Sequence, residues 1–508
     1  MITLDGASLT IEDVVAIAKG RERVRIAAEA VGRMQRSRDH VEVAMRGTTP
    51  VYALNTGVGL LANIRLEDHE IEQMQVNLIR SHCCGVGAPL PATVVRGMML
   101  IRANVLAKGL SGIRAVVAER ICGLLNCGIT PVVPSRGSVG ASGDLAPLAH
   151  MALVLIGEGW AEYRGEVLAA ATCMERAGIE PLMLLGKEGI SLLNGTQAML
   201  SIGCLRLKEL EDLFYAAQTT AALSIEALRG TAAAFDARLH AARPHAGQVL
   251  SASHLLSLLE GSTIPRTHGD GSRIQDAYCL RCIPQVHGAA WDTLQYARGV
   301  FEIELNSATD NPLVFDDAIV SGGNFHGAPL ALALDYLAIA VCQLAGISER
   351  RTERLMNPSL NEGLPAFLAS RPGIESGMMM AQVTAAALVA EMRVLASPAS
   401  TGSIPTSGNQ EDFVSMGMTS GLKLEQAVDL ARMVIAIELL AAARAMDLRG
   451  DTSTPPLERA RASFRARIPV WQEDCVLSVW MEEAAKFLAD CGWKDLGVEQ
   501  VAMEEAVR

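Results

Sequence analysis

Aromatic residues are scarce in this chain, at 4% of 508 residues, although half of all residues are hydrophobic. A core with so few aromatic rings must be packed by aliphatic side chains, which is typical of a large helix-rich body. Positive charge is also in deficit, because 44 Lys and Arg stand against 56 Asp and Glu, a formal net charge of −12. We therefore expect neither nucleic acid nor an acidic membrane surface as a partner.

Signals for export and for membrane insertion are also missing. No basic segment followed by an apolar run stands at Met1, so we expect no signal peptide and a cytoplasmic protein. The most apolar long run, residues 330–347, contains Asp335 and Gln343. These polar residues favour a buried bundle helix over a membrane span.

The cysteine and glycine patterns exclude two common kinds of site. Eleven cysteines without an export signal predict reduced, mostly buried thiols. Cys279 and Cys282 form one C-x-x-C with no second pair and no histidine set nearby, so no metal site is expected. The glycine-rich stretches at 55–59 and 84–87 lack the third glycine and the preceding apolar strand of a dinucleotide fingerprint, so no nucleotide is expected.

The pattern along the chain predicts three regions. Residues 1–110 mix short helical stretches with glycine-rich loops and predict a mixed N-terminal domain. Residues 111–450 are dominated by long apolar helical patterns and predict a central bundle, while residues 451–508 predict a C-terminal helical subregion. The long helices are expected at residues 94–110, 113–127, 187–220, 286–306, 330–355, 378–396 and 422–448.

The tripeptide Ala141-Ser142-Gly143 can build an electrophile from its own backbone. The amide nitrogen of Gly143 can attack the carbonyl carbon of Ala141, because neither residue carries a bulky side chain. Loss of two waters, one from the Ser142 hydroxyl, would leave a methylidene-imidazolone ring. Ordinary side chains are not electrophilic, so a ring of this kind serves where an enzyme needs an electron sink. Asp144 follows directly and is placed to assist the proton transfers.

The surrounding residues 137–148 read Gly-Ser-Val-Gly-Ala-Ser-Gly-Asp-Leu-Ala-Pro-Leu. This segment resembles the shared motif of the aromatic amino-acid ammonia-lyases, the family of histidine, phenylalanine and tyrosine ammonia-lyases and the related aminomutases. The resemblance runs from about residue 2 to about residue 450. It implies a mainly α, fumarase/aspartase-like helical bundle with a self-made methylidene-imidazolone cofactor and no pyridoxal phosphate. It also implies a homotetramer whose sites combine residues from three subunits.

Elimination of ammonia from an amino acid requires a base as well as an electrophile. The candidate base is Tyr52, which needs activation because a tyrosine ordinarily titrates near ~10. Residues 51–59 resemble the family motif Tyr-Gly-x-x-Thr-Gly-Phe-Gly, whose tyrosine is the base on a mobile loop. The chain departs from this motif at Ala53, in place of a glycine, and at Val58, in place of a phenylalanine.

The reaction also needs an anchor for the substrate carboxylate. Arg281 is the candidate, because a guanidinium can hold a carboxylate with two parallel hydrogen bonds. Its surroundings resemble the family stretch Gln-Asp-x-Tyr-Ser-Leu-Arg-Cys-x-Pro-Gln, which implies that Gln275 lines the site and that Tyr278 belongs to its catalytic residues. The resemblance further implies that Asn194 lies near the electrophile and that Phe325 packs near the ring and the substrate.

Two positions bear on the substrate side chain. His82 matches the histidine of the motif Ser-His-x-x-Gly-x-Gly in histidine ammonia-lyases, although some tyrosine aminomutases also carry Ser-His here. Glu411 stands in Asn-Gln-Glu-Asp-Phe-Val-Ser-Met, where phenylalanine and tyrosine enzymes have a glutamine. A carboxylate suits an imidazole, which can donate a hydrogen bond, and is a costly neighbour for a phenyl ring. Phe413 replaces a histidine of this family motif.

These residues predict the conversion of L-histidine into trans-urocanate and ammonia. A lyase or 2,3-aminomutase acting on tyrosine, phenylalanine or another aromatic amino acid is the alternative, supported by Ala53, Val58 and Phe413. A catalytically silent structural relative is a further alternative, against which stand the intact residues Tyr52, Ser142, Asp144 and Arg281.

Overall fold

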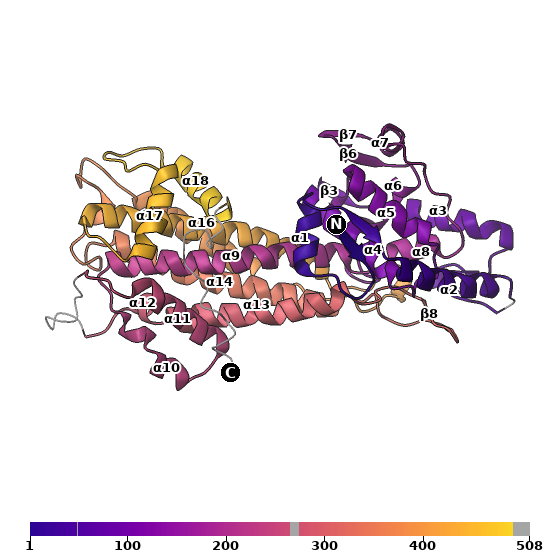
Figure 1. Ribbon diagram of the computed structural model, residues 1–508, viewed down its shortest axis with the longest axis horizontal. Helices are drawn as coiled ribbons and strands as arrows, with labels where there is room; N and C mark the ends of the chain where they lie inside the picture. The colour runs from indigo at the N-terminus through magenta and orange to yellow at the C-terminus, as the bar shows by residue number, and fades with distance from the viewer. Residues whose placement is uncertain (48, 265–273, 491–508) are drawn as a thin grey trace. The chain divides into compact units, whose positions relative to one another are not determined.

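The computed structural model describes residues 1–47, 49–264 and 274–490 (Figure 1). The chain forms two compact units, each assembled from separated segments. The first unit contains Met1–Arg206, Ala297–Asp335 and Pro398–Leu422, and the second contains Leu207–Tyr296, Tyr336–Ser397 and Lys423–Arg508. The predicted division into residues 1–110, 111–450 and 451–508 therefore remains a prediction about independent domains.

The first unit combines small sheets with short and medium helices. Its helices are α1 (Ile11–Ala18), α2 (Ala28–Met45), α3 (Ile71–His82), α4 (Ala92–Ala107), α5 (Ala115–Cys127), α6 (Leu145–Leu155), α7 (Ala170–Ala177) and α8 (Glu188–Leu193). Its strands are β1 (Ile2–Leu4), β2 (Val24–Ile26), β3 (Val86–Pro89), β4 (Ile129–Pro131), β5 (Pro134–Arg136), β6 (Trp160–Tyr163), β7 (Glu166–Ala169), β8 (Leu313–Val314) and β9 (Ile319–Val320).

The strands pair locally and form no large sheet in the described part of the chain. Strand β1 pairs with β2 in parallel, while β3 with β5 and β8 with β9 are antiparallel pairs. Strands β4, β6 and β7 form an antiparallel sheet in that order. The hydrogen bonds between β3 and β5 hold the chain just before the Ala-Ser-Gly segment, which follows β5.

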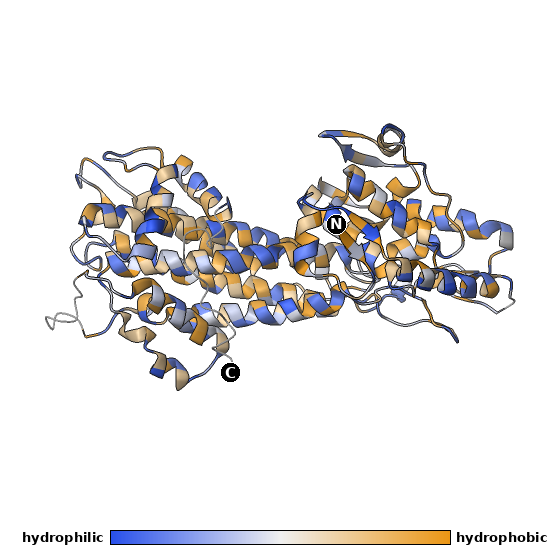
Figure 2. Ribbon diagram, in the orientation of Figure 1, coloured by the Kyte–Doolittle hydropathy of each residue, from blue (hydrophilic) through white to orange (hydrophobic). Residues whose placement is uncertain are grey.

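Local sequence explains where the helices of the first unit begin and end. Thr10 caps α1 through its hydroxyl, which accepts from the Asp13 amide, while the Asp13 carboxylate accepts from the Thr10 amide. Helix α5 ends at Gly128 in the left-handed conformation. Helices α4 and α5 pack together, as do α6 and α8. Hydrophobic residues are frequent on these helices (Figure 2), because most of their faces are buried.

Long helices dominate the rest of the chain. They are α9 (Gln197–Ala227), α13 (Ile283–Leu305), α14 (Ala328–Met356), α15 (Met379–Leu395) and α16 (Gly417–Arg449). The boundary between the two units falls inside α9, α13, α14 and α16. The remaining helices of the second unit are α10 (Ala237–Ala241), α11 (Ala246–Leu259), α12 (Tyr278–Arg281), α17 (Pro455–Arg467) and α18 (Leu477–Asp490). Short 3-10 turns lie in both units, at Gly59–Leu61, Asp68–Glu70, Ala232–Phe235, Ala366–Leu368 and Ser407–Asn409.

The second unit buries an ion pair among its long helices. Arg351 donates to both carboxylate oxygens of Glu438, at 2.6 and 2.8 Å, and both side chains are fully buried. The hydroxyls of Ser224 and Ser348 donate to the same carboxylate at 2.7 and 2.6 Å. The buried charge is thus paired and saturated with hydrogen bonds, as burial requires.

The mainly α fold that the sequence predicts is confirmed, with one correction. The helix expected over residues 187–220 is interrupted, because Asn194 is extended and Gly195 has a φ of +142°. The chain therefore leaves α8, makes a turn and re-enters the helical conformation as α9. Among the described residues, α14 is long and apolar enough to span a membrane by length and composition, and 61% of its most apolar window is buried.

Candidate active site

The Ala-Ser-Gly segment lies in a loop that is pressed against the turn between α8 and α9. The Asp144 amide donates to the Gly195 carbonyl at 2.6 Å, and the Gly195 amide donates to the Ser142 carbonyl at 3.3 Å. Gly143 has a φ of +75°, and a Cβ built on it would overlap the Gly195 carbonyl. Only glycine fits at this position, and the absence of a side chain on Gly143 is also what ring closure requires.

Asp144 is fully buried directly after this tripeptide. One of its carboxylate oxygens accepts from the amides of Ala198 and Met199, each at 2.9 Å, in the first turn of α9. The other accepts from the Ser138 hydroxyl at 3.1 Å. Burial raises the pKa of Asp144 to about 6, although these hydrogen bonds lower it. The carboxylate also stabilises the positive end of the α9 dipole.

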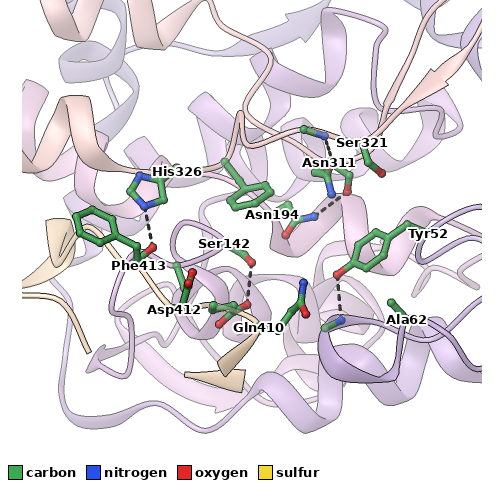
Figure 3. Close-up of a pocket in the computed structure, with 15 residues that line it drawn as sticks. Tyr52, Ala62, Ser142, Asn194, Asn311, Ser321, His326, Gln410, Asp412 and Phe413 are labelled. Atoms are coloured by element: carbon green, nitrogen blue, oxygen red, sulfur yellow. Dashed lines mark hydrogen bonds between the residues drawn. The ribbon is translucent and has the colours of Figure 1, made fainter. Parts of the chain in front are cut away.

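A cavity of about 370 Å³ opens beside the tripeptide (Figure 3). Six residues that the sequence singles out line it: Tyr52, Ala141, Ser142, Asn194, Phe325 and Glu411. They come from five separated segments of the first unit. The structure therefore brings the candidate base and the candidate imidazole-binding carboxylate to the serine of the tripeptide.

Glu411 lies in direct contact with the tripeptide. The Ser142 hydroxyl donates to Glu411 Oε1 at 3.1 Å (Figure 3). The other carboxylate oxygen accepts from the Thr406 hydroxyl at 2.9 Å. The backbones of Thr406 and Glu411 also pair with each other, with the Thr406 amide 2.9 Å from the Glu411 carbonyl. Glu411 is thus fixed at the cavity by its own segment.

The loop carrying Tyr52 is held by its own backbone. The Tyr52 hydroxyl accepts from the Gly59 amide at 3.1 Å (Figure 3). Ala53 is buried and has a φ of +55°, the left-handed region that favours glycine. The glycine of the family motif at this position suits that conformation, and in this chain an alanine occupies it.

Asn194 is oriented by the segments before β8 and after β9. Its side-chain amide donates to the Asn311 carbonyl at 2.8 Å, and Asn311 Oδ1 accepts from the Gly322 amide at 2.8 Å. Figure 3 shows Asn194, Ser142 and Tyr52 around the same space. The amide of Asn194 is therefore satisfied within the chain, and its neighbours fix its direction.

Sequence reasoning did not select several residues that line the cavity: Asn311, Ser321, His326, Gln410 and Asp412. Phe413 also lines it, with a side chain 71% exposed. Its ring stacks on His326 at a centroid distance of 6.3 Å, and His326 Nε2 lies 3.1 Å from the Phe413 carbonyl. The available signal in the sequence is adjacency, because Gln410 and Asp412 flank Glu411 and His326 directly follows Phe325.

Comparison with known proteins agrees with this geometry. Residues 9–466 match the family described as aromatic amino acid lyase. The chain belongs to the aromatic amino acid lyase family. This is the methylidene-imidazolone-dependent class of carbon–nitrogen lyases. The tripeptide, with a tightly packed glycine at its third position and the buried Asp144 directly after it, fits such a group.

Relatives of this lyase include several histidine ammonia-lyases. The enzyme so named from Koribacter versatilis is 52% identical over 94% of this chain and 95% of its own, and that from Gloeobacter violaceus is 49% identical over 96% of both. A solved histidine ammonia-lyase from Trypanosoma cruzi has a TM-score of 0.90 at 41% identity, covering 98% of this chain and 95% of its own. A tyrosine aminomutase from Streptomyces globisporus has a TM-score of 0.93 at 38% identity, covering 97% and 98%.

Six predicted site residues of the lyase do not line this cavity. Gly143 and Asp144 directly follow Ser142, which does line it, and the other four lie elsewhere. His82 belongs to the first unit, at the end of α3, where its Nδ1 lies 2.7 Å from the Leu78 carbonyl. Gln275, Tyr278 and Arg281 belong to the second unit. Tyr278 is 70% exposed, and the Arg281 guanidinium lies 4.6 Å from its ring centroid. Their participation in a site remains a prediction.

None of the cysteines in the described part of the chain lines this cavity. Ten cysteines there are free, including Cys279 and Cys282, and no group of three or more potential metal ligands is found in the same residues. Burial raises the pKa of the Cys83 thiol to about 12. Cys83 is therefore protonated at neutral pH and a poor nucleophile.

Proposed function

We propose that this lyase converts L-histidine into trans-urocanate and ammonia. The observation that carries the proposal is the carboxylate of Glu411, which lies 3.1 Å from the Ser142 hydroxyl in the same cavity as Tyr52. A carboxylate there can accept a hydrogen bond from an imidazole N–H and would be costly beside a phenyl ring. The histidine ammonia-lyases at about 50% identity over most of the chain support the same substrate.

The proposed cofactor is the methylidene-imidazolone ring formed from Ala141, Ser142 and Gly143, which would supply the electrophile that activates the substrate. No metal, nucleotide or pyridoxal phosphate is part of the proposal. Tyr52 would remove the β-proton through its phenol oxygen. The Gly59 amide, which donates to that oxygen, would help to stabilise the phenolate.

The proposed site is completed in a homotetramer. Arg281 would hold the substrate carboxylate, with Gln275 and Tyr278 beside it, and His82 would contact the imidazole. The exposure of Tyr278 and Gln275 in the single chain is compatible with a site that forms on assembly. Cytoplasmic location remains a prediction from the sequence. Size-exclusion chromatography with light scattering tests the tetramer, and a fully active monomer would refute shared sites.

The proposed function is tested by offering L-histidine, L-tyrosine and L-phenylalanine separately to the purified enzyme. We expect urocanate and ammonia in equal amounts from L-histidine alone. The Ser142→Ala variant should fold normally, as judged by circular dichroism, and should lose nearly all turnover because its tripeptide cannot form the ring. Near-normal turnover in this variant would refute the electrophile.

The second candidate is a lyase or 2,3-aminomutase for tyrosine, phenylalanine or another aromatic amino acid. The observation that favours it is the exposed phenyl ring of Phe413 at the cavity, an apolar surface where the histidine-enzyme motif has an imidazole. The same substrate series distinguishes this candidate. Cinnamate-type products or a β-amino acid, without urocanate, would establish it.

A further inference from the structure

A buried charge network lies directly behind Asn194 in the first unit. Arg102 on α4, Lys187 just before α8 and Asp310 after α13 are fully buried. Asp310 Oδ2 lies 3.9 Å from both Arg102 Nη2 and Lys187 Nζ, and within the described residues it accepts no hydrogen bond. Burial lowers the pKa of Arg102 and the charge of Asp310 raises it, and the resulting pKa is about 10. The guanidinium is therefore charged at neutral pH.

The guanidinium of Arg102 joins segments that are far apart in the sequence. Its Nη1 donates to the Asn194 carbonyl, to Gln197 Oε1 at 3.2 Å and to the Thr309 carbonyl at 3.3 Å. Its Nη2 donates to the Ser191 carbonyl. A planar fork can hold several acceptors in one fixed geometry, whereas the single ammonium of a lysine cannot. Arg102 therefore fixes the turn between α8 and α9.

This turn is the surface against which the tripeptide is pressed. Gly195, at its centre, exchanges hydrogen bonds with the Asp144 amide and the Ser142 carbonyl. A Cβ built on Gly195 would come within 2.6 Å of Arg102 Nη1. The guanidinium thus packs directly against Gly195.

We propose that Arg102 is a positioning residue for the self-processing of the tripeptide, which rests on the cofactor proposed above. In that reaction, Gly143 N bonds to the Ala141 carbonyl carbon. The carbonyl oxygen leaves as water with the amide protons of Gly143 and Ser142, while the Ser142 nitrogen forms a double bond to the same carbon. The Ser142 hydroxyl leaves as a second water with the Ser142 Cα proton, whose electron pair forms the Cα=Cβ bond. No oxidant or co-reactant is needed.

The physical reason is the geometry of the attack. The two atoms that join must be held at close range, and a displacement of about 1 Å can cost about a hundredfold in rate. The hydrogen bonds to Gly195 hold the peptide that contains the attacking nitrogen. Without the guanidinium, the carbonyls of Ser191, Asn194 and Thr309 lose a common donor, and the turn that carries Gly195 can relax away from Gly143.

The test is the rate of ring formation in Arg102→Lys, followed by intact mass under denaturing conditions and by near-ultraviolet absorbance. Loss of the mass of two waters reports the ring without any substrate. The matched control is Arg96→Lys on the same helix, because Arg96 also donates to backbone carbonyls, of Ile17 at 3.1 Å and Leu125 at 3.3 Å. Within the described residues, Arg96 makes no hydrogen bond to the turn.

We expect Arg102→Lys to form the ring at least about tenfold more slowly than Arg96→Lys at equal folded fraction. Equal rates in the two folded variants would overturn the inference. If Arg102→Lys does not fold, Arg102→Gln and Arg96→Gln replace the pair, because a glutamine amide has two N–H donors and no charge. Equal rates in those two variants would overturn it as well. A wild-type chain that loses no water would instead refute the proposed cofactor, and the inference with it.

Discussion

The buried carboxylate of Asp144 makes a sharp prediction, because its cost can be estimated from the structure. We expect Asp144→Asn to be more stable than the wild type at neutral pH. The rise in the pKa of Asp144 from 3.8 to about 6 corresponds to about 3 kcal/mol at about 1.36 kcal/mol per unit. The folded state bears this cost wherever the carboxyl is ionised, and an asparagine does not carry it.

The gain is reduced by imperfect hydrogen bonding. The asparagine oxygen can accept from the amides of Ala198 and Met199, and its NH2 group can donate to the Ser138 hydroxyl. Loss of the charge weakens these bonds and the dipole interaction by about 1 kcal/mol. The net stabilisation is therefore about 1–3 kcal/mol above pH 6.

The sign of the pH dependence follows from the raised pKa. Between pH 6 and pH 3.8 the folded wild type binds a proton that the unfolded chain does not, so its stability rises as the pH falls. The advantage of Asp144→Asn should consequently be largest above pH 6 and shrink toward pH 4. Thermal unfolding of both proteins across this pH range measures it.

A second carboxylate provides the matched control. Burial raises the pKa of Asp5, but the amides of Ala7 and Ser8 and the Ser8 hydroxyl lower it, and the net shift is downward. Asp5→Asn should therefore lose stability at neutral pH, the opposite sign. If Asp144→Asn is less stable than the wild type above pH 6, the argument from desolvation is wrong. The prediction that Asp144 assists the proton transfers has its own test, since the same variant should then form the ring more slowly.

Two further predictions concern the cavity. Gly143→Ala should destabilise the protein by at least about 1–2 kcal/mol and prevent ring formation, because its Cβ overlaps the Gly195 carbonyl at a left-handed φ. Gly165 has a φ of +81° and open space around it, so Gly165→Ala measures the backbone penalty alone. Equal behaviour of the two variants in mass and unfolding assays would contradict the steric argument. Glu411→Gln should lower kcat/KM for L-histidine by about tenfold or more, while its tripeptide still loses two waters to form the ring. If Glu411→Gln has a smaller effect than Asp412→Asn in the urocanate absorbance assay, Glu411 does not recognise the substrate.

The sequence by itself determined the fold class and predicted the candidate electrophile. Long apolar helical patterns with few aromatic rings predict a mainly α body. This periodicity is visible in each segment by itself, whichever helices the segment packs against. Ala141-Ser142-Gly143 can cyclise for reasons contained in three adjacent residues. Its surroundings identify the family, and Tyr52, Asn194, Phe325 and Glu411 follow residue by residue from separate motifs.

The tertiary structure alone decided what surrounds the tripeptide. The break between α8 and α9 was missed, because the apolar pattern continues across Asn194 and Gly195 while long-range hydrogen bonds to residues 142–144 favour the turn. The contact between Ser142 and Glu411 joins positions 269 residues apart. The sequence gives no local signal for the network of Arg102, Lys187 and Asp310, because a charged residue normally indicates a solvent-exposed position. Such residues are defined by which distant groups share their burial, and only the folded chain specifies that.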